Sequence, residues 1–226
     1  MRTPLRPTNV LLLTLVLNLP GTLIAQPGSL DPDFATNGKY VQDFGAQDNL
    51  TKVRVQPVDH KIVAVGTALS PAFAGQLLVV RLKPDGTLDE AFNGTGTLVV
   101  TSFTESYAYD LFFQSDGKIV VVGARADANY QFSMLAMRLN ENGTLDNSFG
   151  NGGFSEPEVS TGDDFAYAAA PLANGQLLLA GAALDDQFNN RPVVVRMNAD
   201  GTIDDTFGTN GVAALPVTQQ DNKFWN

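Results

Sequence analysis

The sequence predicts an all-β fold built from tandem repeats, and three observations support this. A phrase of the form Leu/Ile-Asp-x-x-Phe (the LDxxF phrase) occurs four times, and its phenylalanines at positions 34, 92, 149 and 207 are 58, 57 and 58 residues apart. Short apolar runs follow turn-forming pairs at the same places in successive repeats. No stretch has helical periodicity over ten or more positions. A fixed step of this size is typical of repeat architectures, in which each unit buries its apolar face against its neighbours.

Each repeat is predicted to hold four strands. Apolar runs too short for helices are expected to form buried strands, at Lys61–Gly66, Lys118–Gly123 and Gln176–Gly181. The pairs Asp59-His60, Asp116-Gly117 and Asn174-Gly175 precede these runs. Such pairs favour tight hairpin turns, because both central positions need positive φ. A strand should therefore precede each pair, at Lys52–Gln56, Tyr109–Gln114 and Tyr167–Leu172.

The other two strands of each repeat flank the LDxxF phrase. The one before it ends in a second turn pair and is expected at Leu78–Leu82, Leu135–Leu139 and Val194–Met197. The one after it is more variable and is expected at Lys39–Phe44, Thr97–Phe103, Gly153–Val159 and Gly211–Val217. Four antiparallel strands per repeat describe one blade of a β-propeller. An open stack of small sheets is the alternative, but closure into a ring hides strand edges and favours the propeller.

We therefore predict a β-propeller-like tandem array of four-stranded antiparallel units, three complete and one partial. The array runs from 29 to 226, with units at about 31–88, 89–145 and 146–203 and a partial unit at 204–226. Three interpretations of the partial unit stay open: a truncated product of a longer array, an open fragment of a ring, and a subunit that closes with another copy. Truncation is preferred, because Phe224 and Trp225 bring the chain to an apolar end without a polar capping element.

Three linked phrases carry a resemblance to a known family. They are Gly143-Thr144-Leu145-Asp146 continuing to Gly153, Ser115-Asp116-Gly117-Lys118-Ile119, and Arg81-Leu82-Lys83-Pro84-Asp85-Gly86. In this register they resemble the bacterial delta-60 repeat family, from about Ser29 to Asn226. The resemblance implies a propeller-like repeat in exported bacterial proteins, with no shared reaction or ligand.

The N-terminus and the charge bear on location and partners. Arg2 and Arg6 precede an uncharged apolar stretch, and a small residue, Ala25, stands before Gln26. This is typical of a secretory signal peptide at residues 1–25, so we expect a periplasmic, cell-surface or extracellular protein with no membrane insertion after cleavage. The net charge is −10, or −12 without the signal peptide, which carries two of the 14 basic and none of the 24 acidic residues. So acidic a surface repels phosphate backbones and argues against nucleic-acid partners.

The recurring polar residues of the LDxxF phrase are predicted to be structural. The aspartates Asp31, Asp89, Asp146 and Asp204 can accept backbone N–H bonds in a turn. The phenylalanines Phe34, Phe92, Phe149 and Phe207 are expected to fill the space between adjacent blades. Arg81, Arg138 and Arg196 each lie eight residues before one of these aspartates, at a spacing that suits an ion pair. A calcium site in the oxygen-rich loop Asn198–Asp205 is the functional rival, although the loop lacks EF-hand spacing.

No catalytic residue, cofactor or metal site is predicted. The chain has no cysteine, and its one histidine, His60, occupies a turn position that glycine fills in the other repeats. We expect a scaffold for binding at the cell envelope or outside the cell, with a protein or glycan partner. The loops Thr67–Gln76, Ala124–Gln131 and Ala182–Arg191 vary around a constant frame, and Tyr130, Phe132 and Phe188 are candidate contacts. The alternatives are a secreted carbohydrate-active hydrolase or lyase, a fragment without independent activity, and self-association through the incomplete fourth unit.

Overall fold

The computed structural model describes residues 28–184 and 189–214, and these form β-strands and turns without a helix. The predicted signal peptide, Phe188 and the last twelve residues lie outside the described residues. The strands are β1 (Asp48–Val55), β2 (Ile62–Leu69), β3 (Gly75–Leu82), β4 (Thr97–Val99), β5 (Glu105–Phe113), β6 (Ile119–Ala126), β7 (Phe132–Leu139), β8 (Phe154–Ser155), β9 (Asp164–Pro171), β10 (Leu177–Leu184), β11 (Asn190–Met197) and β12 (Val212–Ala214).

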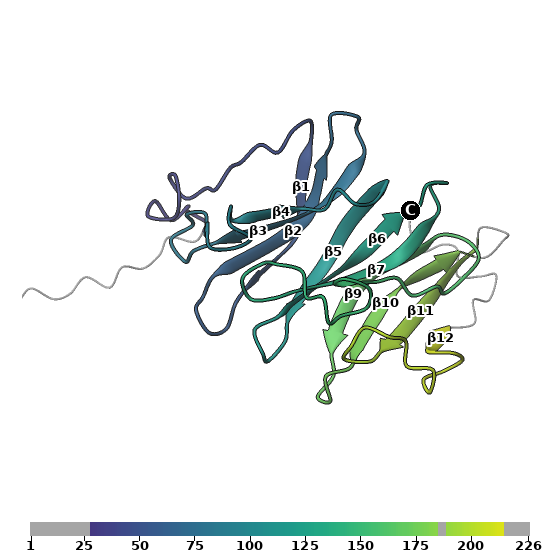
Figure 1. Cartoon of the computed structure of the whole chain (residues 1–226). Coiled ribbons are helices and arrows are strands. Elements are labelled where there is room, and N and C mark those ends of the chain that lie inside the picture. The colour runs from purple at the N-terminus through teal and green to yellow at the C-terminus, as the bar shows by residue number, and fades with distance from the viewer. Residues whose placement is uncertain (1–27, 185–188, 215–226) are drawn as a thin grey trace, which may run out of the picture.

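The strands form three four-stranded antiparallel sheets, which confirms the predicted all-β array of three complete units. We call them blade 1 (β1–β4), blade 2 (β5–β8) and blade 3 (β9–β12), and in each the strands pair in chain order. Figure 1 shows the blades side by side in the order of the chain. The first strand of each blade, here called the inner strand, contacts the neighbouring blades: β5 packs on blade 1 and β9 on blade 2.

The blades are offset from the repeat units expected from the sequence. Each LDxxF phrase was expected to open a unit, yet the strand after it pairs with the strand just before it, as Leu98 does with Val79 and Ala213 with Val194. β12 is therefore the fourth strand of blade 3, not the start of a partial unit. The expected strand at Lys39–Phe44 is not formed, because no strand precedes it in the described residues to offer a paired edge. The physical reason is proximity, since a short turn brings consecutive segments together.

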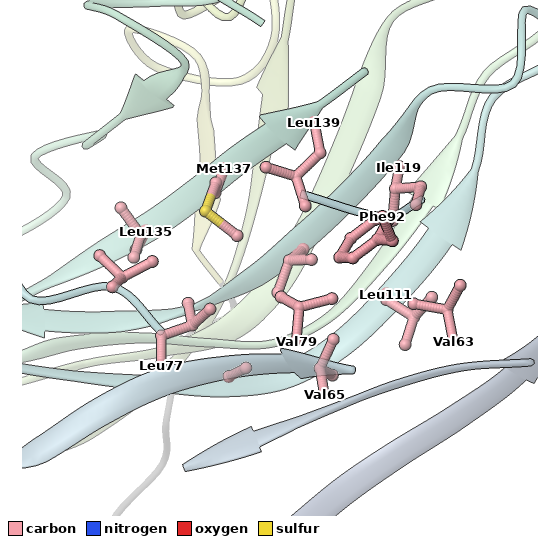
Figure 2. Close-up of a cluster of buried hydrophobic side chains, with 13 residues drawn as sticks. Val63, Val65, Leu77, Val79, Phe92, Leu111, Ile119, Leu135, Met137 and Leu139 are labelled. Atoms are coloured by element: carbon pink, nitrogen blue, oxygen red, sulfur yellow. The ribbon is translucent and has the colours of Figure 1, made fainter. Parts of the chain in front are cut away.

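Two apolar cores hold the blades face to face. Figure 2 shows the first, where Val65 and Leu77 of blade 1 meet Leu111 and Met137 of blade 2, and Phe92 fills one end. The second joins the opposite face of blade 2 to blade 3, with Val120 of blade 2 and Leu179 of blade 3 among its buried members. The side chains in each core come from two neighbouring blades, and each sheet shields the apolar face of the other from water. Stacking between blades therefore stabilises the fold.

The outer face of blade 1 is covered by the segment that precedes it. Phe34, Tyr40 and Phe44 pack on Leu78 and Val80 of β3. This segment carries the first LDxxF phrase, so it occupies the place that the end of a preceding blade would take.

Each inner strand carries a β-bulge at the same repeat position. The register shifts at Thr51 in β1, Tyr109 in β5 and Tyr167 in β9. Opposite each bulge lies the glycine that ends the apolar run of the second strand. At Gly123 an added Cβ would lie 1.8 Å from the carbonyl oxygen of Tyr107. Only glycine allows the two backbones to come this close.

Candidate functional site

The LDxxF phrase forms one clamp in every blade. An arginine in the third strand donates from Nε to Oδ2 of the aspartate, and its guanidinium lies over the phenylalanine ring. The ion pairs are Arg81–Asp89 at 2.8 Å, Arg138–Asp146 at 2.7 Å and Arg196–Asp204 at 2.7 Å. The guanidinium carbon lies 4.7, 4.6 and 4.7 Å from the ring centroids of Phe92, Phe149 and Phe207. Charge pairing and ring contact thus fix the same arginine from two sides.

A lysine that was not predicted to take part completes two of the clamps. Lys61 Nζ lies 3.3 Å from Asp89, and Lys118 Nζ lies 3.4 Å from Asp146. In blade 3 the equivalent residue is Gln176, whose Nε2 donates to Asp204 at 2.6 Å. The lysine stands 28 residues from its aspartate, so only the pairing of the second strand with the third brings them together.

The clamp also joins each blade to the next. Arg81 Nη1 donates to the carbonyl oxygen of Glu141, and Arg138 Nη1 to that of Ala199, in turns of the following blade. The residue after each buried phenylalanine donates its backbone N–H to the same turns: Asn93 to Asn142, and Gly150 to Asp200, both at 2.7 Å. Phe92 and Phe149 are fully buried beneath these turns. These bonds between blades fit the structural role predicted for the arginine, aspartate and phenylalanine of the clamp.

Asp31 and Phe34 form only part of this arrangement. Asp31 is exposed and accepts a hydrogen bond from the backbone N–H of Asp33 at 3.0 Å. Phe34 is half-buried against the turn of blade 1, and Ala35 donates its N–H to the carbonyl oxygen of Asp85 at 2.7 Å. No arginine stands eight residues before Asp31, where Leu23 lies.

The clamp carboxyls have low pKa values. Burial raises the pKa of Asp146, but hydrogen bonds from Ser148 and the Arg138 guanidinium outweigh it and hold the pKa at about 2. Hydrogen bonds from Thr206 lower the pKa of Asp204, also to about 2, although partial burial opposes them. Both carboxyls therefore stay ionised in the folded protein well below the pH at which they protonate in an unfolded chain.

This difference predicts acid unfolding. A carboxyl whose pKa is depressed by folding stabilises the fold above its unfolded pKa of about 4, and that contribution is lost as the pH falls toward the folded value. We expect the urea midpoint to be level near neutral pH and to fall steeply between about pH 4 and pH 2. Asp146→Asn should flatten this dependence while lowering the midpoint at pH 7. A wild-type midpoint that stays constant down to pH 2 would contradict the assignment.

The oxygen-rich loop of blade 3 is bonded internally. Asp200 Oδ1 accepts from the backbone N–H and the hydroxyl of Thr202, at 3.0 and 2.7 Å, and Asp204 is held in the clamp. Within residues 28–184 and 189–214 no three His, Asp or Glu side chains gather closely enough to hold a metal ion. The internal bonds of this loop are those of a turn, and the calcium alternative stays a prediction.

A buried carboxylate at the inner strands was missed by sequence reasoning. Asp110 on β5 is buried, with Lys52 Nζ and Arg54 Nη2 of β1 each 3.2 Å from Oδ1, and the backbone N–H of Ala169 on β9 3.2 Å from Oδ2. One side chain thus joins all three blades. Its partners are 56 to 59 residues away along the chain, so no local pattern could have revealed the contact.

Aromatic side chains gather at the opposite end of the blades from the clamps. The loops Ser70–Ala74 and Asp127–Gln131 are closed by equivalent backbone hydrogen bonds. Phe73 and Tyr130 stand at the same position in the two loops, with φ of 63° and 62°, and are 70% and 63% exposed. A left-handed conformation costs a bulky residue about 1–2 kcal/mol, and an exposed ring gains no burial in return. The recurrence of a strained, exposed aromatic residue at one position of two blades makes these loop tips a candidate binding surface.

Next to these loops, five half-buried or exposed rings form a continuous row across β5, β7 and β9. Neighbouring ring centroids are 5.3 to 6.0 Å apart, and the planes of Phe165 and Tyr167 differ by only 2°. In order along the row the rings are Tyr107, Phe132, Phe165, Tyr167 and Tyr109. We call the row, together with Phe73 and Tyr130, the aromatic end.

A cleft of about 400 Å³ lies beside Tyr107, between blades 1 and 2. Gln47, Asn49 and Thr67 are among its lining residues. The Tyr107 hydroxyl donates to Glu105 Oε2 at 2.5 Å, and burial, followed by this carboxylate, raises the pKa of Tyr107. Its ring packs over Gly75, where any Cβ would lie 2.5 Å from Cε1. The cleft thus combines an aromatic wall with amide and hydroxyl groups, as ligand sites commonly do.

The equivalent place between blades 2 and 3 is filled. Phe132 stands where blade 1 has Gly75, and its ring lies 5.4 Å from that of Phe165. Gln131 Nε2 and the backbone N–H of Phe132 donate across the boundary to Thr161 O and Asp163 Oδ1, at 2.8 and 2.9 Å. The open cleft is therefore a property of the first blade boundary and not of the repeat in general.

Two of the three contacts proposed from the sequence are in the described structure. Tyr130 is at the loop tip and Phe132 is in the row, while Phe188 lies outside the described residues. Phe73 was missed, although a signal existed: positions 73, 130 and 188 are 57 and 58 residues apart, and all three are aromatic. His60 has a φ of 57°, at the turn position where Gly117 has 83°. This conformation fits the turn role expected for it.

Three antiparallel meanders stacked through repeated inter-blade clamps define a β-propeller repeat domain. Three segments of the chain match the family described as a domain of unknown function (DUF5122) beta-propeller, at residues 59–92, 114–149 and 172–207. Each segment begins near the first hairpin turn of a blade and ends at the phenylalanine of its clamp. The chain is thus similar to this family in all three blades, and the narrower resemblance to the delta-60 repeats stays a prediction. No curated protein matches the chain.

Proposed function

We propose that the chain is an exported β-propeller scaffold that binds a neutral glycan at its aromatic end. The observation that carries the proposal is the pair of strained, exposed rings, Phe73 and Tyr130, beside a continuous aromatic row. Flat aromatic faces stack against the apolar faces of sugar rings. The amide and hydroxyl groups of the neighbouring cleft can bond sugar hydroxyls.

The negative charge of the chain favours a neutral polysaccharide over a nucleic acid as the ligand that stacks on these rings. Aromatic platforms also bind the bases of single-stranded nucleic acids, but they do so beside positively charged grooves. This chain has a net charge of −10, and Glu105 and Asp48 lie next to the row and the cleft. A polyanion would be repelled, whereas a neutral polysaccharide would not.

Export is the second part of the proposal, and the N-terminal pattern of Arg2, Arg6 and the apolar stretch before Ala25 supports it. Within the described part of the chain there is no helix of the length and apolarity that a membrane span requires. Expression of the full chain in a bacterium, followed by N-terminal sequencing of the periplasmic and culture fractions, tests export. We expect the exported form to begin at Gln26, and a full-length product retained in the cytosol would contradict the proposal.

Binding is tested by affinity electrophoresis and calorimetry with soluble neutral polysaccharides: a β-glucan, a mannan and dextran. Tyr130→Asn and Phe73→Asn should each weaken binding at least tenfold. Because asparagine tolerates positive φ, neither change should lower the free energy of unfolding, and a gain of about 1 kcal/mol is expected from relief of strain. Val58→Asn, in an exposed loop at the clamp end, is the matched control and should leave binding unchanged.

Two results would overturn the glycan proposal. One is the absence of binding to any of the three polysaccharides by the wild-type chain. The other is a loss of stability in Tyr130→Asn and Phe73→Asn, since it would show that these rings serve packing and not recognition.

A further inference from the structure

Blade 3 presents an apolar face that is covered in the other two blades. In blade 2 the face toward blade 3 carries Val120, Val122, Met134 and Ala136, all fully buried. The equivalent positions in blade 3 are Leu178, Ala180, Pro192 and Val194, and these are half-buried or exposed. Blade 3 is thus one half of a blade interface whose other half is missing from the described residues.

The clamp residues of blade 3 are also less covered than those of blades 1 and 2. The Arg196 side chain is 26% exposed, against 3% for Arg81 and 7% for Arg138. Arg81 and Arg138 each donate from Nη1 to a turn carbonyl of the next blade, and Arg196 has no such carbonyl within the part of the chain that the structure describes. Phe207 is only half-buried, whereas Phe92 and Phe149 are fully buried.

The complementary half lies at the other end of the array. Val53 and Val55 on β1 are 60% and 56% exposed. Their equivalents on β5, Leu111 and Phe113, pack against blade 1 in the first core. In blade 2 the inner strand uses these apolar residues to cover the preceding blade. The inner strand of blade 1 has equivalent residues, but within the described residues no blade precedes it.

We propose that a second copy of this chain fills both places, with blade 1 of each copy packed on blade 3 of the other. The contact continues an interface that the molecule already makes twice, between blades 1 and 2 and between blades 2 and 3. It is heterologous, and such contacts close into a ring when the rotation between neighbouring blades allows it; here closure takes two copies. Two sets of three blades make a six-bladed ring, within the usual range of roughly four to eight.

The segment around Phe34 must leave its place on blade 1 before the ring can form. Phe34 and the Ala35 N–H occupy the turn at Asp85 and Gly86, where Phe207 and the Gly208 N–H of the second copy would dock. The turn has room for one phenylalanine. On association, Phe207 of the second copy therefore replaces Phe34 at this turn. Phe34 thus competes with self-association from within the chain.

Sedimentation of the full chain over a range of concentrations, with two surface variants, tests the proposal. We expect a dimer of twice 24.1 kDa for the wild type. Val53→Lys blocks the blade 1 side and Ala180→Lys the blade 3 side. Both positions are exposed, so both variants should fold. Each variant alone should be monomeric, and an equal mixture should recover a heterodimer through the one intact interface. Val58→Lys, a matched change on the clamp-end loop, should not alter the dimer.

Phe34→Ala adds a readout that an ordinary packing role would not give. Removing the competitor should tighten the dimer at least fivefold, whereas Phe207→Ala should weaken it by a similar factor. A wild-type chain that stays monomeric at all concentrations, with Phe34→Ala also monomeric, would overturn the proposal and point to residues 215–226 as the cover of blade 3. Failure of the mixed variants to associate would overturn the head-to-tail geometry.

Discussion

Gly123→Ala is expected to destabilise the fold by on the order of 3 kcal/mol, and so to remove a large part of the stability of a typical domain. The new Cβ would lie 1.8 Å from the Tyr107 carbonyl oxygen, inside the contact distance of any real atom pair. Relief requires the two paired strands β5 and β6 to separate at the bulge beside Tyr109. Urea unfolding should show a lower midpoint with an unchanged slope.

Gly94→Ala is the matched control for this prediction. No atom lies within 4 Å of the added Cβ at Gly94, and only the positive φ of 75° opposes the change. We expect a cost of about 1 kcal/mol, the price of a left-handed conformation for alanine. Equal effects of the two substitutions would show that close approach at the bulge does not explain why the glycine recurs.

Arg138→Met should cost about 3–5 kcal/mol, because it leaves the buried carboxylate of Asp146 without its main partner. The substitution also removes the bond to the Ala199 carbonyl oxygen, and with it a link between blades 2 and 3. Thermal or urea unfolding measures the loss. The double variant Arg138→Met with Asp146→Leu should recover much of it, since an apolar pair of similar volume leaves no buried charge.

Arg196→Met provides the internal comparison, because it breaks the same ion pair at the open end of the array. Its side chain is 26% exposed, and solvent replaces part of what is lost. At protein concentrations where the chain is monomeric, we expect a cost of at most about 1 kcal/mol. If Arg138→Met and Arg196→Met had equal effects, the clamp would act within a blade, and its role in joining blades would be refuted.

The two ends of the blades differ in burial and in how far they vary between repeats. At one end, the clamp residues of blades 1 and 2 are buried, paired and alike, as residues that maintain stacking must be. At the other end, the loops of blades 1 and 2 share a backbone path, yet one boundary is an open cleft at Tyr107 and the next is filled by Phe132. Variation on a constant frame is how repeat scaffolds acquire binding surfaces.

Several features could be predicted because their causes are local in sequence. The period and the short apolar runs predicted three four-stranded units, and the sheets confirm them. The eight-residue spacing of Arg138 and Asp146 suggested an ion pair, and the two side chains lie 2.7 Å apart. The arginine and the aspartate come together because the turn after the third strand places the LDxxF phrase beside that strand.

Other features depend on which blade lies against which. Each LDxxF phrase was expected to open a unit, but hydrogen bonding between consecutive strands places the phrase inside a blade and not at its start. Asp110, joined to β1 and β9, and the aromatic row across β5, β7 and β9 combine residues from separate repeats. No spacing within one repeat contains that information.

By itself, the sequence determined the repeat, the strands within it and the residues that brace each turn, because backbone preference and short loops set these within some fifty residues. Only the tertiary structure decided that strained rings gather at one end and that blade 3 and the inner strand of blade 1 leave apolar side chains exposed. The reason is that burial is a property of neighbours: equivalent side chains on successive blades differ in exposure according to whether another sheet covers them.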